Sequence, residues 1–237
     1  NSLYNWSSLS SFKQGKLQLQ DLDQRFDNII KIQKIFLHCY FDSPETKYLF
    51  KEITSDQNTD FSRYNYFYAL YISTAESTKN AKEIVNTALK LYPRNLLINQ
   101  FKINLKDNKN FSLFNCKKKE HVVAELLYIT ANALSSQSIY SLSNFYLNLA
   151  RYLNEDFYSY DTLLAENFYK INNFKKSKKI YRNLTNFGEA FNWYSSKQIS
   201  KILIQEEDLN EALDLLNKSY QDLENKDIYE TFDYAEF

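Results

Sequence analysis

The stretch NFKKSKKIYRNLTNFGEAFNWYSSKQISKILIQEEDLNEALDLL, from Asn173 to Leu216, states one short pattern twice. Phe174–Ser177 runs from an apolar residue through two polar ones to a small residue, and Leu209–Ala212 repeats that order. A bulky apolar residue follows each small one by four positions, at Tyr181 and at Leu216. Repetition at a fixed distance is typical of an array of similar structural units, and this decides the fold.

The small residue serves as a marker that can be followed outward along the chain. It stands at Ser143, Ser177 and Ala212, separated by 34 and 35 residues, and also at Ala81. The positions four and seven residues after each marker are mostly apolar or small, and this spacing places all three on one helical face. A further small residue lies twelve positions before each marker, which predicts a hairpin of two closely packed helices. These earlier residues are Ala69, Ala131, Ala165 and Ser200.

The composition supports an all-helical fold. The 237 residues are 44% hydrophobic, which is enough for a sizeable core, but they include only 2 Gly and 2 Pro. Few tight turns are therefore specified, and short connections between helices are favoured over sheets rich in β-hairpins. Met is absent, so we expect the chain to begin inside a longer product. The sequence leaves the compartment unknown, either the cytoplasm or the periplasm.

The marker pattern resembles the tetratricopeptide repeat, whose unit of about 34 residues forms a helical hairpin. The family has small residues at the eighth, twentieth and twenty-seventh positions and often a proline near the end of the unit. Ala69, Ala81, Ala88 and Pro93 match one unit in this way, and three later units match with Ser often replacing Ala. The resemblance is to degenerate bacterial members. It implies an all-α fold, a right-handed solenoid or alpha-alpha superhelix.

The resemblance divides the chain into five parts. The period slips between Ala81 and Ser143, which are 62 residues apart. There LLINQFKINL predicts an inserted helix and KDNKNFSLFNCKKKE a polar connection. The parts are 1–59, degenerate N-terminal helical repeats; 60–93, one repeat; 94–120, the inserted helix and polar loop; 121–226, three repeats; and 227–237, the first helix of a truncated further repeat.

The charges argue against a nucleic-acid partner. Lys and Arg total 29 and Asp and Glu total 29, so there is no positive excess to neutralise a phosphate backbone. The distribution is uneven, however. Residues 170–183 carry six basic residues and no acid, and residues 206–237 carry eleven acids against two lysines, a net charge of minus nine. Such runs are typical of a solvated helix face or of an interaction surface. The sequence predicts no membrane span, because it lacks a run of 18 apolar residues.

The residues that usually carry chemistry are sparse. Cys39 and Cys116 are the only cysteines, and their distance along the chain predicts no disulfide framework. His38 and His121 are the only histidines and do not form a ligand motif. Two isolated glycines cannot form a phosphate-binding loop or a nucleophile elbow. We therefore expect no enzyme activity, no metal and no cofactor.

The resemblance also implies a binding groove. First helices of stacked hairpins line a concave surface that can hold a peptide or a protein helix. In the tetratricopeptide family, groove residues fall mainly at the second, fifth, ninth, twelfth and thirteenth positions of each unit. Carried over to this chain, the candidates are Arg63, Tyr66, Leu70, Glu125, Tyr128, Asn132, Thr162, Glu166, Tyr169, Lys170, Lys197 and Lys201, with Tyr194 and Gln205 beside them.

The sequence thus predicts a non-catalytic scaffold that binds a protein or peptide on its concave face. The alternative is a structural or assembly subunit that self-associates through its repeat ends. A groove binder should expose a continuous surface over Tyr66, Tyr128 and Tyr169. An assembly subunit should instead expose apolar side chains at Trp6 and around 229–237.

Overall fold

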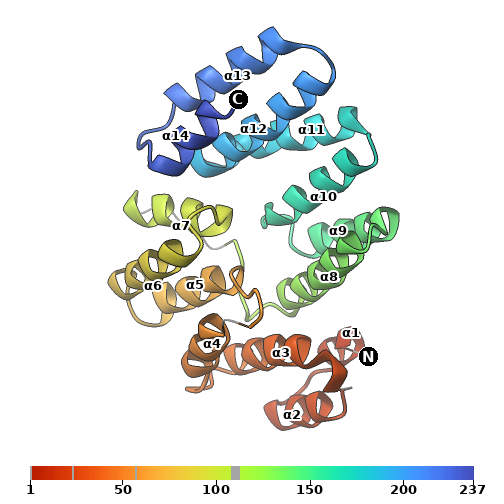
Figure 1. The fold of residues 1–237 in the computed structure, drawn as a ribbon. Coiled ribbons are helices and arrows are strands. Elements are labelled where there is room, and N and C mark those ends of the chain that lie inside the picture. Colours follow the sequence, from red (N-terminus) through yellow and green to blue (C-terminus); the bar gives the residue numbers. More distant parts are fainter. Residues whose placement is uncertain (1, 23, 57, 108–112) are drawn as a thin grey trace.

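The computed structural model of this chain describes residues 2–22, 24–56, 58–107 and 113–237. Within these residues every regular element is helical, which confirms the all-α prediction (Figure 1). The helices are α1 Ser2–Ser7, α2 Phe12–Gln20, α3 Asp27–Tyr40, α4 Thr46–Ser55, α5 Tyr64–Ala75, α6 Thr78–Leu91, α7 Leu96–Lys106, α8 Lys119–Ser136, α9 Tyr140–Leu153, α10 Ser159–Lys170, α11 Phe174–Leu184, α12 Glu189–Gln205, α13 Leu209–Gln221 and α14 Ile228–Ala235, with 3₁₀ turns at η1 Gln24–Phe26 and η2 Thr185–Phe187.

Four helical hairpins contain the small residues of the repeat pattern: α5 with α6, α8 with α9, α10 with α11, and α12 with α13. All of these small side chains are buried where the two helices meet. Where serine replaces alanine, its hydroxyl donates to a backbone carbonyl of the other helix, twelve residues away. A buried hydroxyl is therefore satisfied at the point of closest approach. These bonds are Ser143 Oγ to Ala131 O at 2.7 Å, Ser177 Oγ to Ala165 O at 2.9 Å and Ser200 Oγ to Ala212 O at 3.0 Å.

Three of the hairpins turn through a left-handed residue that is not glycine. The residue lies five positions before the marker in each case, with φ of 62° at Ser138, 57° at Asn172 and 65° at Glu207. The next residue donates its N–H to a carbonyl five positions back, which is a helix-ending pattern that usually employs glycine. The distances are 2.9 Å from Ile139 to Leu134, 2.8 Å from Asn173 to Phe168 and 2.9 Å from Asp208 to Leu203. This explains how so glycine-poor a chain forms short helical turns.

Helix α7 connects the first hairpin to the last one. It packs against α6 and against α12, beside which it lies in Figure 1. The amide oxygen of Gln100 on α7 accepts the backbone N–H of Ala190 at 3.0 Å. Gly188, with a φ of 118°, lies directly against the Gln100 amide, so that a side chain there would collide with it. The units from α5 to α12 therefore follow a circuit that closes on itself.

The N-terminal helices α1 to α4 join the same hydrophobic core as the hairpins. Trp6 on α1 is only 4% exposed and its ring contacts that of Tyr40, with centroids 6.1 Å apart. Of the predicted polar connection within 94–120, residues 108–112 lie outside the described residues. The rest of that connection, from Leu113 to Lys118, leads into α8, and Phe114 is buried in the core.

The structure corrects the prediction for the two cysteines. Cys39 near the end of α3 and Cys116 before α8 form a disulfide, with their Cα atoms 6.0 Å apart across 77 residues of chain. The prediction was wrong because distance along the chain says nothing about distance in space once the chain returns past its own N-terminal helices. The bond ties the N-terminal helices to the segment that begins the second half of the molecule.

Candidate interaction surfaces

The first groove position, Arg63, is bound within the protein. Its guanidinium donates to both carboxylate oxygens of Glu125, at 2.7 and 2.8 Å, and to the Ser159 hydroxyl at 2.8 Å. The charged carbon of Arg63 also lies 3.8 Å from the ring centroid of Tyr128. Helices α5, α8 and α10 therefore meet at one buried ionic cluster, which fills the place where the sequence predicted the start of a groove.

By itself, burial shifts the pKa values of the two charged groups of this cluster in opposite directions. Burial alone lowers the pKa of Arg63, but the neighbouring Glu125 carboxylate outweighs this effect and raises it, so the guanidinium stays charged. Burial raises the pKa of Glu125, and the charge and hydrogen bonds of Arg63 offset part of that increase. The bidentate geometry is that of strong, directional ion pairs between arginine and a carboxylate. Neither group can lose its partner without leaving an unpaired charge in the core.

Five of the other groove positions make contacts between neighbouring hairpins or helices. The Tyr194 hydroxyl donates to the Glu166 carboxylate, and the Gln205 amide donates to the Tyr169 hydroxyl at 2.7 Å. Lys197 pairs with Asp233 on α14. Each of these contacts joins a residue of one unit to a residue of the next, so most of the groove candidates hold the units together.

The burial of several candidates corrects the expected groove. Tyr66 is 2% exposed, Leu70 is 7% exposed and Glu125 is fully buried, so in this structure these three are core residues rather than partner contacts. They are buried because the units close on themselves and bring α5, α8 and α10 together. The continuous surface expected over Tyr66, Tyr128 and Tyr169 is interrupted at Tyr66.

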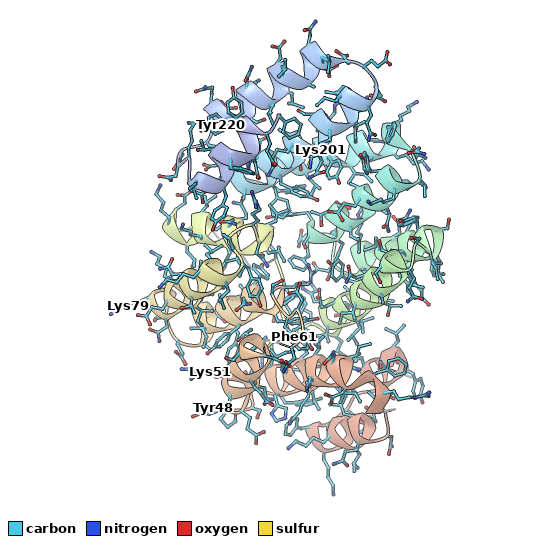
Figure 2. All side chains as sticks on the ribbon, viewed as in Figure 1. Tyr48, Lys51, Phe61, Lys79, Lys201 and Tyr220 are labelled. Carbon is cyan, nitrogen blue, oxygen red and sulfur yellow. A yellow bond between two sulfur atoms is a disulfide. The ribbon has the colours of Figure 1, made fainter. Side chains whose placement is uncertain are left out.

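The remaining candidates are scattered. Asn132 and Lys170 are exposed, and Thr162 is half-buried and donates to the Ser159 carbonyl of its own helix. Lys201 is exposed on α12 (Figure 2). Its ammonium lies 6.0 Å from the Phe237 ring centroid. These residues come from three different units and do not form one patch in which a peptide would contact them together.

An exposed apolar stripe runs along α9, on the second helix of its hairpin. Leu142 is 44% exposed, Phe145 57%, Leu149 38% and Tyr152 85%. The spacings of three, four and three residues keep these side chains on one face, and the polar residues exposed beside them, Ser141 and Asn148, carry no charge. The opposite face of α9 carries the small and buried residues that contact α8. Repeat matching could not separate these two faces, because both are apolar.

Helix α11, the second helix of the hairpin that follows, is strongly basic on its exposed face. Lys175, Lys176, Lys179 and Arg182 are exposed there. Helix α10 contacts both α9 and α11 and so holds them in sequence. Four of the six basic residues of the predicted basic segment therefore lie on one solvent-exposed helix face.

The C-terminal helix α14 presents a second exposed apolar surface. Ile228 is 76% exposed, Phe232 54% and Tyr229 38%. Its inner side is held by an ion pair from Arg94 to Asp233 at 2.6 Å and by a stack of Tyr234 on Tyr220 with ring centroids 4.2 Å apart. The assembly-subunit hypothesis expected exposed apolar side chains at Trp6 and around 229–237. They are exposed at 228–232, whereas Trp6 is buried.

The described residues contain no group of three or more His, Cys, Asp and Glu side chains arranged to hold a metal ion. No helix among them has both the length and the apolar character that crossing a membrane requires.

In comparisons with known proteins, no family model and no curated protein matches this chain.

Proposed function

We propose that this chain is a non-catalytic protein-interaction scaffold, a right-handed superhelix of tetratricopeptide-like hairpins that binds a helix of a partner protein on the outer face of α9. The observation that carries the proposal is the exposed stripe of Leu142, Phe145, Leu149 and Tyr152. The proposal moves the binding site away from the concave face, because the groove positions there are bonded to one another.

The spacing of the stripe specifies a helical partner. Alternating steps of three and four residues are those of the a and d positions of a coiled coil, where side chains of one helix insert between those of another. A surface helix normally turns such a stripe toward the core, but α9 has a second apolar face for that purpose. The stripe is therefore available to an amphipathic helix from outside the chain.

Charge complementarity specifies the flanks of that partner. The stripe itself is uncharged, and helix α11, which α10 joins to α9, exposes Lys175, Lys176, Lys179 and Arg182. A partner helix with acidic residues beside its apolar stripe would be steered to this face and oriented on it, whereas a basic one would be repelled. We expect the partner helix to be acidic.

The disulfide supports a location of the protein in an oxidising compartment. Disulfides form and persist in secreted and periplasmic proteins and are rare in the reducing cytosol. Of the two compartments that the sequence left open, the periplasm agrees better with the Cys39–Cys116 bond.

A designed peptide tests the proposal. The probe is a helix of about three heptads with Leu at a and d and Glu at the flanking positions, and its binding is followed by fluorescence anisotropy. We expect Phe145→Glu to weaken binding by about tenfold or more, because it places a charge in the centre of an apolar contact. Thr87→Glu adds the same charge to the exposed face of α6 and should leave binding unchanged.

Two results would contradict the proposal. The first is equal binding of the peptide to the native chain and to Phe145→Glu. The second is equal binding of the acidic peptide and of a matched peptide with Lys at the flanking positions, because the charges of α11 would then play no part.

A second candidate function, an assembly subunit, is favoured by the exposed side chains of α14. The segment 206–237 is acidic, with eleven acids against two lysines, and Ile228 and Phe232 are exposed on it. Contact between this end of one copy and the basic, apolar outer face of another would be head-to-tail and would build open chains. Light scattering should then show a molar mass that rises with concentration for the native chain and for Phe232→Leu but not for Phe232→Glu. A monomer at all concentrations would exclude this candidate.

A further inference from the structure

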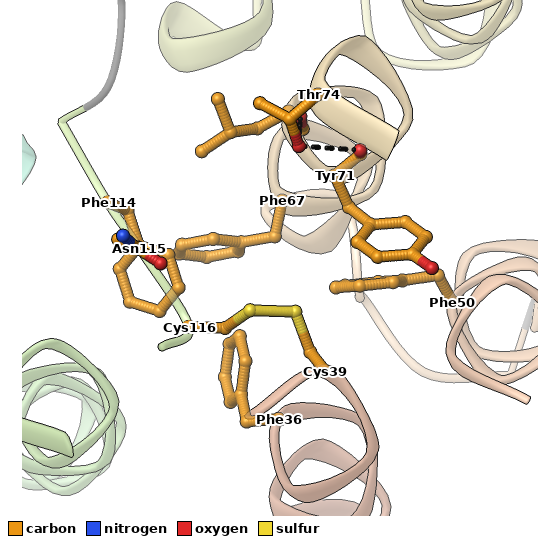
Figure 3. A pocket seen from close by; sticks show the side chains of 10 residues that line it. Phe36, Cys39, Phe50, Phe67, Tyr71, Thr74, Phe114, Asn115 and Cys116 are labelled. Carbon is orange, nitrogen blue, oxygen red and sulfur yellow. Dashed lines mark hydrogen bonds between the residues drawn. A yellow bond between two sulfur atoms is a disulfide. The ribbon is translucent and has the colours of Figure 1, made fainter. Parts of the chain in front are cut away.

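An apolar pocket of about 280 Å³ lies beside the disulfide, where α3, α4, α5 and the segment before α8 meet (Figure 3). Aromatic rings form most of its wall: Phe36 from α3, Phe50 from α4, Phe67 and Tyr71 from α5, and Phe114 from the segment before α8. Three of these, Phe36, Phe50 and Phe67, are at most 2% exposed. The wall is therefore made of side chains that the core already holds in place.

The rings present both edges and faces to the pocket. Phe67 meets Phe36 edge-on, with centroids 5.5 Å apart, and meets Phe114 in the same manner at 4.6 Å. Phe50 and Tyr71 lie tilted on each other at 5.7 Å, toward the other end of the disulfide in Figure 3. An aromatic guest could make offset or edge-to-face contacts with several rings at once, which are the favoured geometries for ring pairs.

The polarity of the pocket excludes a charged guest. None of the residues that line it is charged. The polar groups on the lining side chains are the hydroxyls of Thr74 and Tyr71 and the amide of Asn115. The Thr74 hydroxyl donates to the Tyr71 carbonyl at 2.9 Å, so its oxygen can accept a hydrogen bond from a guest. A charged group would lose its hydration without gaining a partner, whereas one O–H or N–H donor could be satisfied.

The disulfide holds the pocket together. Cys39 and Cys116 both line it, and their bond joins α3 to the segment that carries Phe114 and Asn115. Without that bond the segment that carries Phe114 would be held only by packing and by hydrogen bonds, such as those from the Asn154 amide to the Leu113 carbonyl and from the Asn115 N–H to His121 Nδ1, both 3.1 Å. A rigid wall lowers the ordering cost of binding a small guest.

From this geometry we propose that the pocket binds a neutral aromatic compound of about two fused rings that carries one hydrogen-bond donor. An apolar cavity of about 150 Å³ holds benzene, and this pocket is almost twice as large. A guest would remove the apolar wall from water and add dispersion contacts with its rings, and both effects favour binding. The site is separate from the α9 stripe and shares no residue with it.

Calorimetry with 2-naphthol as the probe tests this proposal on the full chain. We expect binding of one molecule per chain. Thr74→Trp should weaken it by about tenfold or more, because the new ring would occupy the exposed mouth of the pocket. Ala75→Trp is the matched control, since it places the same ring on the neighbouring exposed position outside the pocket, and it should change affinity by less than about twofold.

Chemical selectivity provides an independent test. Octanoate, which is aliphatic and charged, and 2-naphthoate, which differs from the probe by its charge, should bind at least about tenfold more weakly than 2-naphthol. Circular dichroism of both tryptophan variants checks that they remain folded. The proposal is overturned if native protein binds no 2-naphthol up to its solubility limit, if both variants weaken binding equally, or if naphthoate binds as well as naphthol.

Discussion

Removal of the Cys39–Cys116 disulfide should strongly destabilise the protein. The bond closes a loop of 77 residues, and it links helices at the N-terminus to the segment that precedes α8. In the unfolded chain such a link removes many conformations, so its loss raises the entropy of the unfolded state. The double variant Cys39→Ala and Cys116→Ala makes this change without leaving a buried polar group or a free thiol.

The size of the effect follows from the loop length. For a loop of 77 residues the chain-entropy relation gives about 4.5 kcal/mol at 25 °C. In a chain of this size that corresponds to a lowering of Tm by about 9 to 18 °C. This exceeds the cost of losing the two buried sulfur atoms, which is about 1 kcal/mol for each removed group of similar size.

Urea denaturation followed by circular dichroism measures the effect. The native chain is unfolded with and without a reductant, and the double variant is unfolded in the same two buffers. The reductant should shift the native curve toward that of the variant and leave the variant unchanged. A difference below about 1 kcal/mol between oxidised and reduced native chain would refute the reasoning, as would free thiols detected in the oxidised protein.

Three further predictions concern stability. Glu125→Gln leaves the Arg63 charge unpaired and should cost about 3 kcal/mol in urea denaturation, whereas the double variant Arg63→Met and Glu125→Leu should cost less; the reverse order would contradict the role given to this pair. Glu207→Gly should stabilise the protein by about 0.5 kcal/mol because of the left-handed backbone at this position, but Gln205→Gly, at the last residue of α12, should destabilise it. Burial raises the pKa of Glu230 to about 7, so its contribution to stability is present below about pH 4.5 and is lost as the pH rises through 7. Glu230→Gln should abolish this part of the pH dependence, and an unchanged profile would exclude it.

Much of the local structure could be predicted from the sequence alone. The positions of Ser143, Ser177 and Ala212 located three second helices, because a small residue at a fixed spacing is a local requirement for two helices to approach closely. The scarcity of glycine and proline indicated helices rather than sheets. The turns at Ser138, Asn172 and Glu207 escaped notice, because serine, asparagine and glutamate adopt many conformations and signal a left-handed turn far less clearly than glycine does.

The tertiary structure alone decided which surfaces are free. The bond between Arg63 and Glu125, the docking of Gln100 on Ala190 and the Cys39–Cys116 link join residues 62, 90 and 77 positions apart. Their formation depends on how far each hairpin rotates relative to the one before it, and small rotations accumulate along the array. A repeat pattern specifies the contacts inside each hairpin, but it does not determine the total rotation that builds up from one hairpin to the last. The sequence therefore determined the units, whereas the closure of the array decided that the predicted groove is bonded to itself and that α9 faces outward.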